Sequence, residues 1–265
     1  MNANGAIEWI RRYEAADGLD RKSWVLGKRR PSNAEGGSTA LVLSRSSDAI
    51  CDPAKPRIVS VPPTIAPDAA LAAPILATML AVWEELHLEL GEIAVVTGDG
   101  VHSSMAGVAA TICGALPVVH LGRQVASHGE LHRISVRSDE SEACLDRLRG
   151  IMCDGYGVAA VELSGQAGVL DLLLESLPRY SRLMLAGSRS QPATIDYYNN
   201  IHRKGVFVLT RDLEPAAHLG TTPGKGMEDY LRRAFILLED RDTACRCVDA
   251  LLLSPNKDPL RQASD

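Results

Sequence analysis

One glycine-broken stretch, residues 91–123, constrains the fold of this chain more than any other part of the sequence. It opens with Ile93–Thr97, a short apolar run rich in β-branched residues, which is typical of a strand buried on both faces. Gly98-Asp99-Gly100 interrupts the run, an alanine-rich stretch follows over 103–116, and a second apolar run covers 117–121. The order strand, glycine turn, helix, strand is typical of the βαβ unit that binds a dinucleotide pyrophosphate at the start of its helix.

The glycines of this turn depart from the dinucleotide fingerprint at one position. The fingerprint G-x-G-x-x-G here reads Gly98-x-Gly100-x-x-Ser103, so a serine replaces the glycine that lets helix and strand pack closely. Gly98, Gly100, Ser103 and Ser104 are the candidate pyrophosphate ligands, and the two serines add hydroxyl donors. The alternative is a turn that binds nothing because Ser103 prevents close approach. His102, inside the turn, is either a phosphate partner or an exposed loop residue.

Composition narrows the class of protein. Hydrophobic residues make up 46% of the 265 residues and aromatic residues only 4%, which favours a helix-rich α/β fold over an all-β one. The net charge is −5 and no basic block stands out, which argues against a nucleic-acid partner. No apolar run approaches the roughly 20 residues of a membrane span, and the N-terminal segment lacks the apolar core of a signal peptide. We therefore expect a cytoplasmic protein with no membrane partner.

Strand and helix patterns alternate along the rest of the chain. We expect a helix over 6–16, a loop over 21–37, strands at 39–43 and 58–61, and a long helix over 67–88 that Pro74 interrupts. Further strands are expected at 133–136, 158–163, 181–186 and 206–210, and further helices at 140–151, 168–177, 195–202 and 227–240. The alternation from residue 93 to residue 240 predicts an α/β fold with a doubly wound parallel sheet.

The order of these elements resembles the medium-chain dehydrogenase/reductase superfamily, the zinc alcohol dehydrogenase-like proteins. Four stretches carry the likeness: RIVSVPPTIAPDAALAAPILATMLAVWEEL, GEIAVVTGDGVHSSMAGVAATICGA, VAAVELSG and YYNNIHRKGVFVLT. Together they lie within residues 57–240. The resemblance implies a Rossmann-like cofactor domain over 58–253, with hydride transfer at a cleft near Thr78, Ser164 and Gly187.

The chain also departs from the family pattern. Only about 57 residues precede the cofactor domain, so residues 1–57 are interpreted as a short, reduced, β-containing remnant of the family's GroES-like catalytic region, and 254–265 as a tail. The Gly-His-Glu motif and the four-cysteine lobe of the zinc enzymes are missing. If Thr78 matches the family's helix threonine, Pro74 occupies a ligand position. Cys245 and Cys247 lack partners at zinc-site spacing. We expect no metal ligands.

The end of the second strand of the unit predicts which dinucleotide is bound. An NAD-binding chain carries a carboxylate there for the ribose 2′-hydroxyl, and this chain carries Gly122-Arg123 instead. Because a guanidinium grips a phosphate through two hydrogen bonds, Arg123 favours NADP. The alternative is that Arg123 is a solvated surface residue.

Tyr198 and His202, with Tyr197 beside them, form a polar cluster at helical spacing. A tyrosine–histidine pair is suited to relaying a proton in a metal-free reductase, so these two are the candidate catalytic residues. The competing interpretation is a packed surface helix or a subunit contact. Glu162 ends an apolar strand and is either a structural hydrogen-bond acceptor or part of the cleft.

Three functions remain open. The first is a zinc-independent, NADP-dependent oxidoreductase, or a redox-neutral relative, acting on a small organic substrate. The second is a dehydrogenase fold reused as a non-catalytic partner subunit. The third is an enzyme of another class whose emptied cofactor cleft holds the substrate. In the resembling family the late strand at 206–210 commonly pairs across a dimer, so we expect a homodimer.

Overall fold

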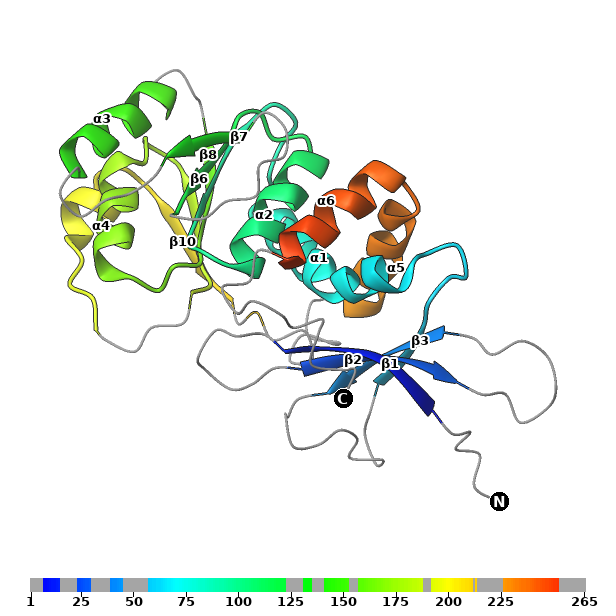
Figure 1. Cartoon of the computed structure of the whole chain (residues 1–265). Coiled ribbons are helices and arrows are strands. Elements are labelled where there is room, and N and C mark those ends of the chain that lie inside the picture. Colours follow the sequence, from blue (N-terminus) through cyan, green and yellow to red (C-terminus); the bar gives the residue numbers. More distant parts are fainter. Residues whose placement is uncertain are drawn as a thin grey trace. The chain divides into compact units, whose positions relative to one another are not determined.

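The computed structural model describes residues 7–14, 23–29, 39–44, 57–122, 131–134, 141–152, 157–187, 192–211, 213 and 226–252. Contacts divide the chain into two compact units, one formed by residues 1–77 with 214–265 and the other by residues 78–213. Figure 1 labels most of their helices and strands. The first unit contains an antiparallel sheet and the second a parallel one.

A parallel sheet is the centre of the second unit. Its described strands lie in the order β10-β9-β8-β5-β6-β7, and every neighbouring pair is parallel. Numbered along the chain, the order is 6-5-4-1-2-3, which is the doubly wound order of dinucleotide-binding domains. The predicted doubly wound α/β fold is thus confirmed. The strands are β5 (Ile93–Thr97), β6 (Val118–Leu121), β7 (Leu131–Ile134), β8 (Val158–Glu162), β9 (Arg182–Leu185) and β10 (Phe207–Thr210).

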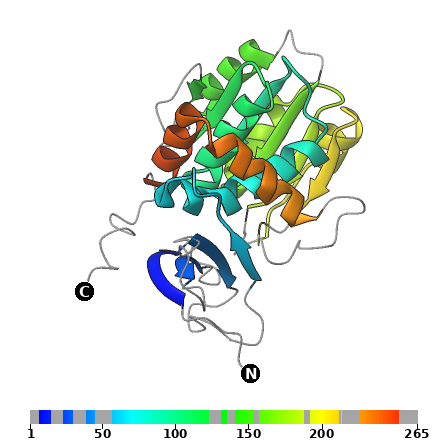
Figure 2. The ribbon, with the colours of Figure 1, turned by 90° about the vertical axis from the view of Figure 1, so that its right-hand side faces the viewer.

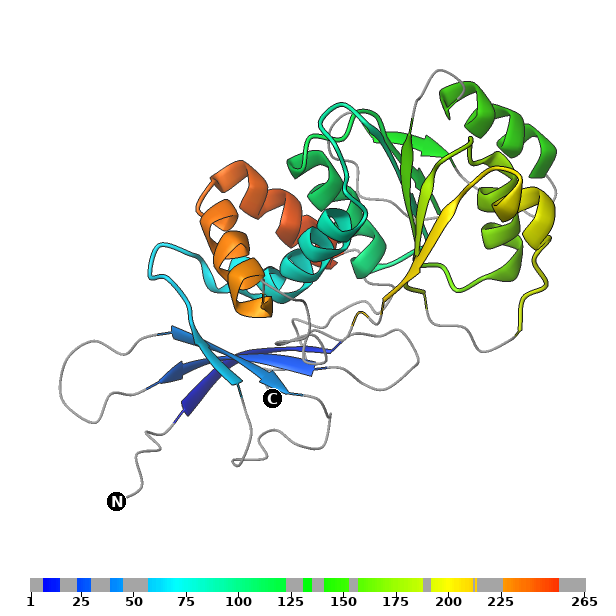
Figure 3. The ribbon, with the colours of Figure 1, turned by 180° about the vertical axis from the view of Figure 1, so that it is seen from behind.

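Helices cover both faces of this sheet, as Figures 1 and 3 show, with α3 and α4 on one side and α2 on the other. The bounds are α2 (Val101–Ile112), α3 (Ser141–Met152), α4 (Ala167–Ser176) and the single π-helical turn η1 (Tyr198–His202). Alternate strand residues face α3 and α4: Val95, Val119, Ala160 and Leu183 are fully buried in one apolar cluster with Leu148 of α3. This two-sided burial explains why β5, β6 and β8 read as continuous apolar runs.

The helix α1 (Pro67–Glu85) is continuous, so the expectation that Pro74 interrupts it is wrong. A proline inside a helix costs about 3 kcal/mol. Burial outweighs that cost here, because Ile75, Leu76 and Met79 have no exposed surface. Just after the helix, His87 has a positive φ of 50°, and the amide of Leu88 then donates to the carbonyl of Trp83 at 3.0 Å.

The first unit contains an antiparallel sheet in the order β1-β2-β3-β4. Its strands are β1 (Ile7–Glu14), β2 (Ser23–Arg29), β3 (Thr39–Ser44) and β4 (Arg57–Ser60). The expected helix over 6–16 is therefore wrong, and the expected loop over 21–37 is wrong where the chain is described, at 23–29. The described part of each segment contains β-branched and aromatic residues, such as Ile10 in β1 and Trp24 in β2, and these favour strands once a partner strand is available. The predicted β-containing N-terminal segment is confirmed.

Two helices close the described chain, α5 (Met227–Leu238) and α6 (Arg241–Leu252). Figure 2 shows them in orange and red, one directly after the other. The sequence predicted α5 but not α6. Asp240 separates them: its Oδ2 accepts the amide of Thr243 at 2.8 Å, so it caps the start of α6, and this hydrogen bond lowers the pKa of Asp240. None of the described helices has the length and apolar character that a membrane span requires.

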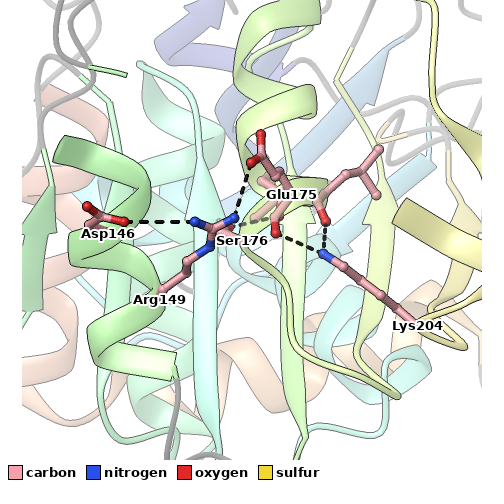
Figure 4. A network of polar contacts seen from close by, with 7 residues as sticks. Asp146, Arg149, Glu175, Ser176 and Lys204 are labelled. Atoms are coloured by element: carbon pink, nitrogen blue, oxygen red, sulfur yellow. Dashed lines mark hydrogen bonds and ion pairs between the residues drawn. The ribbon is translucent and has the colours of Figure 1, made fainter. Parts of the chain in front are cut away.

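A polar network ties the start of β10 to α4 and α3 (Figure 4). Lys204 Nζ donates to the carbonyls of Leu174 at 2.7 Å and Glu175 at 2.8 Å, the last turn of α4, where a cation complements the helix dipole. Arg149 Nη2 of α3 donates to Glu175 Oε1 at 3.1 Å and lies 3.8 Å, through Nη1, from Asp146. Burial, and then the charge of Arg149, lower the pKa of Lys204, while Glu175 opposes them.

Lys204→Met is expected to lower the free energy of unfolding by about 0.5–1 kcal/mol at neutral pH, because two helix-end carbonyls lose their donor. The loss is small because the wild-type protein must partly bury the charge of Lys204, and that cost offsets part of the stability that the two hydrogen bonds contribute. Folding lowers this pKa, so the unfolded chain holds the proton more tightly. The contribution of Lys204 to stability therefore rises with pH across the window just below its ordinary value of 10.5. Urea unfolding at about pH 7 and about pH 9.5 tests both signs. Arg203→Met, an exposed control, should change stability by under about 0.5 kcal/mol.

Candidate functional site

Four loops meet at the carboxyl edge of the parallel sheet, because parallel strands all end at the same edge. Glycines make their close contact possible. A methyl group on Gly98, after β5, would lie 2.9 Å from the amide nitrogen of Ser164, and one on Gly187, after β9, 2.7 Å from that of Gly165. One on Gly122, after β6, would lie 2.5 Å from the carbonyl oxygen of Gly98. Only glycine fits these three positions, so the backbones of the four loops are in direct contact.

The glycine turn after β5 is fastened to β6 by two hydrogen bonds. The amide of Gly98 donates to the carbonyl of Leu121 at 2.8 Å, and His120 Nε2 lies 2.9 Å from the carbonyl oxygen of Gly98. Because a carbonyl oxygen only accepts, Nε2 must carry the proton. His120 is fully buried in β6. Sequence reasoning missed its role, although a histidine inside an apolar strand beside a glycine turn is a signal that was available.

The two serines of the turn differ in what their hydroxyl groups do. Ser103 Oγ donates to the carbonyl of Gly100 at 3.0 Å, so its proton closes the first turn of α2 and is not left for a phosphate. The buried hydroxyl of Ser104 makes no hydrogen bond within the described residues. Gly100 is the N-cap of α2 at a φ of 124° and offers no side chain. The first amides of α2 are therefore the donors that the helix itself cannot use.

Glu162, the last residue of β8, is fully buried and organises the next loop. Its Oε1 accepts the hydroxyl of Ser164 at 2.5 Å and the amide of Gly165 at 2.9 Å. It also lies 3.5 Å from Thr97 Oγ1 at the end of β5, and that hydroxyl accepts the amide of Leu163 at 3.1 Å. The interpretation of Glu162 as a structural hydrogen-bond acceptor is confirmed, and the loops that it holds follow β5 and β8.

Tyr198 and His202 lie at the other edge of the sheet. Their rings stack at 5.5 Å between centroids and both residues are exposed. His202 accepts, through its carbonyl, the amide of Gly205 at 3.1 Å, directly before β10 begins. The four residues of β10 then span about 13 Å to the carboxyl edge. The structure does not bring this pair to the glycine loops.

The remaining predicted site residues are placed as follows. Thr78 is buried in α1. Arg123 lies outside the described residues. Burial raises the pKa of Cys247 to about 12 and that of Cys113 to about 11, which keeps both thiols protonated and makes them poor metal ligands. Among the described residues, no group of three His, Cys, Asp or Glu side chains is placed to hold a metal ion.

Comparison with known proteins identifies the fold. No protein-family model and no curated protein sequence matches the chain. Among solved structures, an alcohol dehydrogenase from Thermus sp. ATN1 matches 90% of this chain and 83% of its own at a TM-score of 0.66 and 15% identity. The chain has the fold of the medium-chain alcohol dehydrogenases. The resemblance predicted from the sequence is confirmed at the level of fold.

Two dehydrogenases of Escherichia coli show the same medium-chain fold. L-idonate 5-dehydrogenase matches 91% of this chain and 82% of its own at a TM-score of 0.65 and 13% identity. Galactitol-1-phosphate dehydrogenase matches 91% and 83% at a TM-score of 0.64 and 12% identity. At such identities the likeness shows the fold, and the function has to be argued from the residues at the carboxyl edge.

Proposed function

We propose that the chain is an oxidoreductase that binds a nicotinamide dinucleotide at the carboxyl edge of its parallel sheet. The observation that carries the proposal is the glycine contact of Gly98 and Gly187 with the loop that follows β8. These contacts hold the glycine turn directly before α2, whose first backbone amides have no side-chain cap, and the start of a helix favours an anion. The dehydrogenase names of the solved structures with this fold support the same conclusion.

The residues at the carboxyl edge of the parallel sheet fit the parts of a dinucleotide separately, the pyrophosphate beside α2 and the nicotinamide beside the later strands. Gly100, the N-cap of α2, carries no side chain that would cover the first turn of that helix, and the buried hydroxyl of Ser104 is a donor without a partner in the described chain. Ser164 and Gly187 flank the neighbouring strand ends, where the nicotinamide ring would lie. The bound dinucleotide would supply the hydride chemistry. No catalytic role for Tyr198 or His202 is included in the proposal.

The finer points of the proposal rest on the sequence. Gly122 followed by Arg123 favours NADP, and the missing zinc motifs favour a zinc-independent reaction on a small organic substrate. The homodimer would form through β10, an edge strand of the described sheet on which Phe207 is 63% exposed and Leu209 is 40% exposed.

Titration with NADPH tests the proposal, followed by energy transfer from tryptophan to the reduced nicotinamide. Wild-type protein is expected to bind at micromolar concentration. Gly98→Ala should weaken binding tenfold or more, because a methyl group there strains a residue with a φ of 109° and meets backbone atoms at 2.9–3.1 Å. The matched control is Gly150→Ala in α3, where a methyl group meets nothing within 4 Å, and it should bind like the wild type.

Absence of binding by wild-type protein to both NADPH and NADH at millimolar concentration would contradict the proposal. The hypothesis that the cofactor cleft holds a substrate of another class of enzyme would then replace the oxidoreductase proposal. Equal affinities for Gly98→Ala and Gly150→Ala would place the dinucleotide elsewhere in the molecule.

A further inference from the structure

We propose that Asp99 reads the adenosine ribose of the dinucleotide and is a specificity-determining residue that disfavours a 2′-phosphate. The inference rests on the proposed function, because it concerns the same ligand. Asp99 stands between the two glycines of the turn after β5. At the sequence level it is only the variable residue of that turn.

The turn holds Asp99 at a defined place. The preceding residue, Gly98, is bonded to β6 through both its amide and its carbonyl, to Leu121 at 2.8 Å and to His120 at 2.9 Å. The following residue, Gly100, is the N-cap of α2. The backbone on each side of Asp99 is therefore anchored, on one side to the second strand of the unit and on the other to the helix.

The carboxylate of Asp99 lies over the end of β6. A methyl group on Gly122 would be 2.7 Å from Asp99 Oδ1, so the oxygen is in contact with the residue that directly follows this strand. Asp99 is exposed, so the carboxylate lies at the surface of this edge of the sheet. In a doubly wound domain, the end of this strand is where the ribose 2′ position of a dinucleotide is read.

A carboxylate at this place discriminates between the two dinucleotides. It accepts a hydrogen bond from the 2′-hydroxyl of NADH, and it repels the 2′-phosphate of NADPH. In the sequence, Gly122 stands where an NAD-binding chain carries its acidic residue. In the structure, Asp99, which follows the neighbouring strand β5, supplies an acidic group at this place. Its charge opposes the binding of NADP, which Arg123 favours.

Asp99→Asn tests the inference with NADPH and NADH as the two probes. The exchange keeps the size of the side chain and removes its charge. NADPH is expected to bind about five- to tenfold more tightly, and NADH about fivefold more weakly because a charge-assisted hydrogen bond becomes a neutral one. The NADPH difference should shrink between about 0.05 M and about 0.5 M salt, since exposed charges are screened.

Glu89→Gln is the matched control, because it removes the same charge from an exposed residue of the connection before β5, at the opposite edge of the sheet. It should leave both affinities unchanged. A different role for Asp99 is stabilisation of the start of α2, where a negative charge is favourable. In that case Asp99→Asn would lower the melting temperature and change both affinities by the same factor, which would overturn the inference.

Two further outcomes separate this inference from the proposed function. If wild type binds both dinucleotides and Asp99→Asn leaves their affinity ratio unchanged, the inference fails and the proposed function stands. If neither dinucleotide binds to wild type or variant, the proposed function fails and this inference falls with it.

Discussion

Replacing Trp83 by alanine will lower the free energy of unfolding by about 3–5 kcal/mol, the range for deleting a buried aromatic side chain. Trp83 belongs to the last turns of α1 and has no exposed surface. Its indole Nε1 donates to the carbonyl of Ala106 in α2 at 2.9 Å. The residue therefore joins the two helices that precede and follow β5, and alanine leaves a cavity between them.

Trp83→Phe separates the two contributions. Phenylalanine keeps most of the apolar volume and loses the indole donor, so the loss should be about 1–2 kcal/mol. Urea denaturation followed by far-ultraviolet circular dichroism measures both variants. A loss below about 1 kcal/mol for Trp83→Ala would mean that the contact between α1 and α2 is not part of the stable core.

Replacing Glu162 by alanine will cost about 3 kcal/mol or more, because the hydroxyl groups of Thr97 and Ser164 and the amide of Gly165 lose a buried acceptor together. Glu162→Gln keeps one acceptor oxygen in the same place and should cost less than half as much. Dinucleotide binding should be lost in the alanine variant and largely retained in the glutamine variant, since the loop after β8 depends on that oxygen.

The control for this pair is Glu175→Ala, which removes a glutamate whose side chain is 54% exposed and pairs with Arg149. An exposed ion pair contributes about 1 kcal/mol or less. Equal losses for Glu162→Ala and Glu175→Ala would show that burial of the Glu162 carboxylate contributes nothing to the loop. Both variants are measured by urea denaturation at the same pH.

The fold was predictable where local pattern and tertiary burial agree. The strands from β5 to β10 lie within two residues of their expected bounds, and for β5, β6 and β8 the reason is that strands buried on both faces read as nearly unbroken apolar runs. The apolar spacing of residues 6–16 suits a helix, but residues 7–14 form a strand because they pair with β2. The sequence does not predict α6, because its composition is polar and Asp240, which caps it, equally fits the end of the preceding helix.

The site was predictable in part for a related reason. Gly98 and Gly100 follow from the turn itself, since a sharp strand-to-helix turn needs positive φ. The positions of His120 and Asp99 against the neighbouring strand depend on sheet pairing, which no single stretch of sequence contains. Tyr198 and His202 form the expected cluster. Their turn precedes β10, however, and a turn that precedes a strand lies at the amino edge of a parallel sheet, away from the glycine loops.

The most direct measurement of the central claim is a titration of isotope-labelled wild-type protein with NADPH, followed through backbone amide resonances. If the dinucleotide binds at the carboxyl edge of the sheet, the largest shifts are expected on the loop residues there: Gly98, Gly100, Ser164, Gly165 and Gly187. Amides of η1 and of the start of β10, at the opposite edge, should move little. Shifts confined to that opposite edge, or no shifts at millimolar NADPH, would contradict the account.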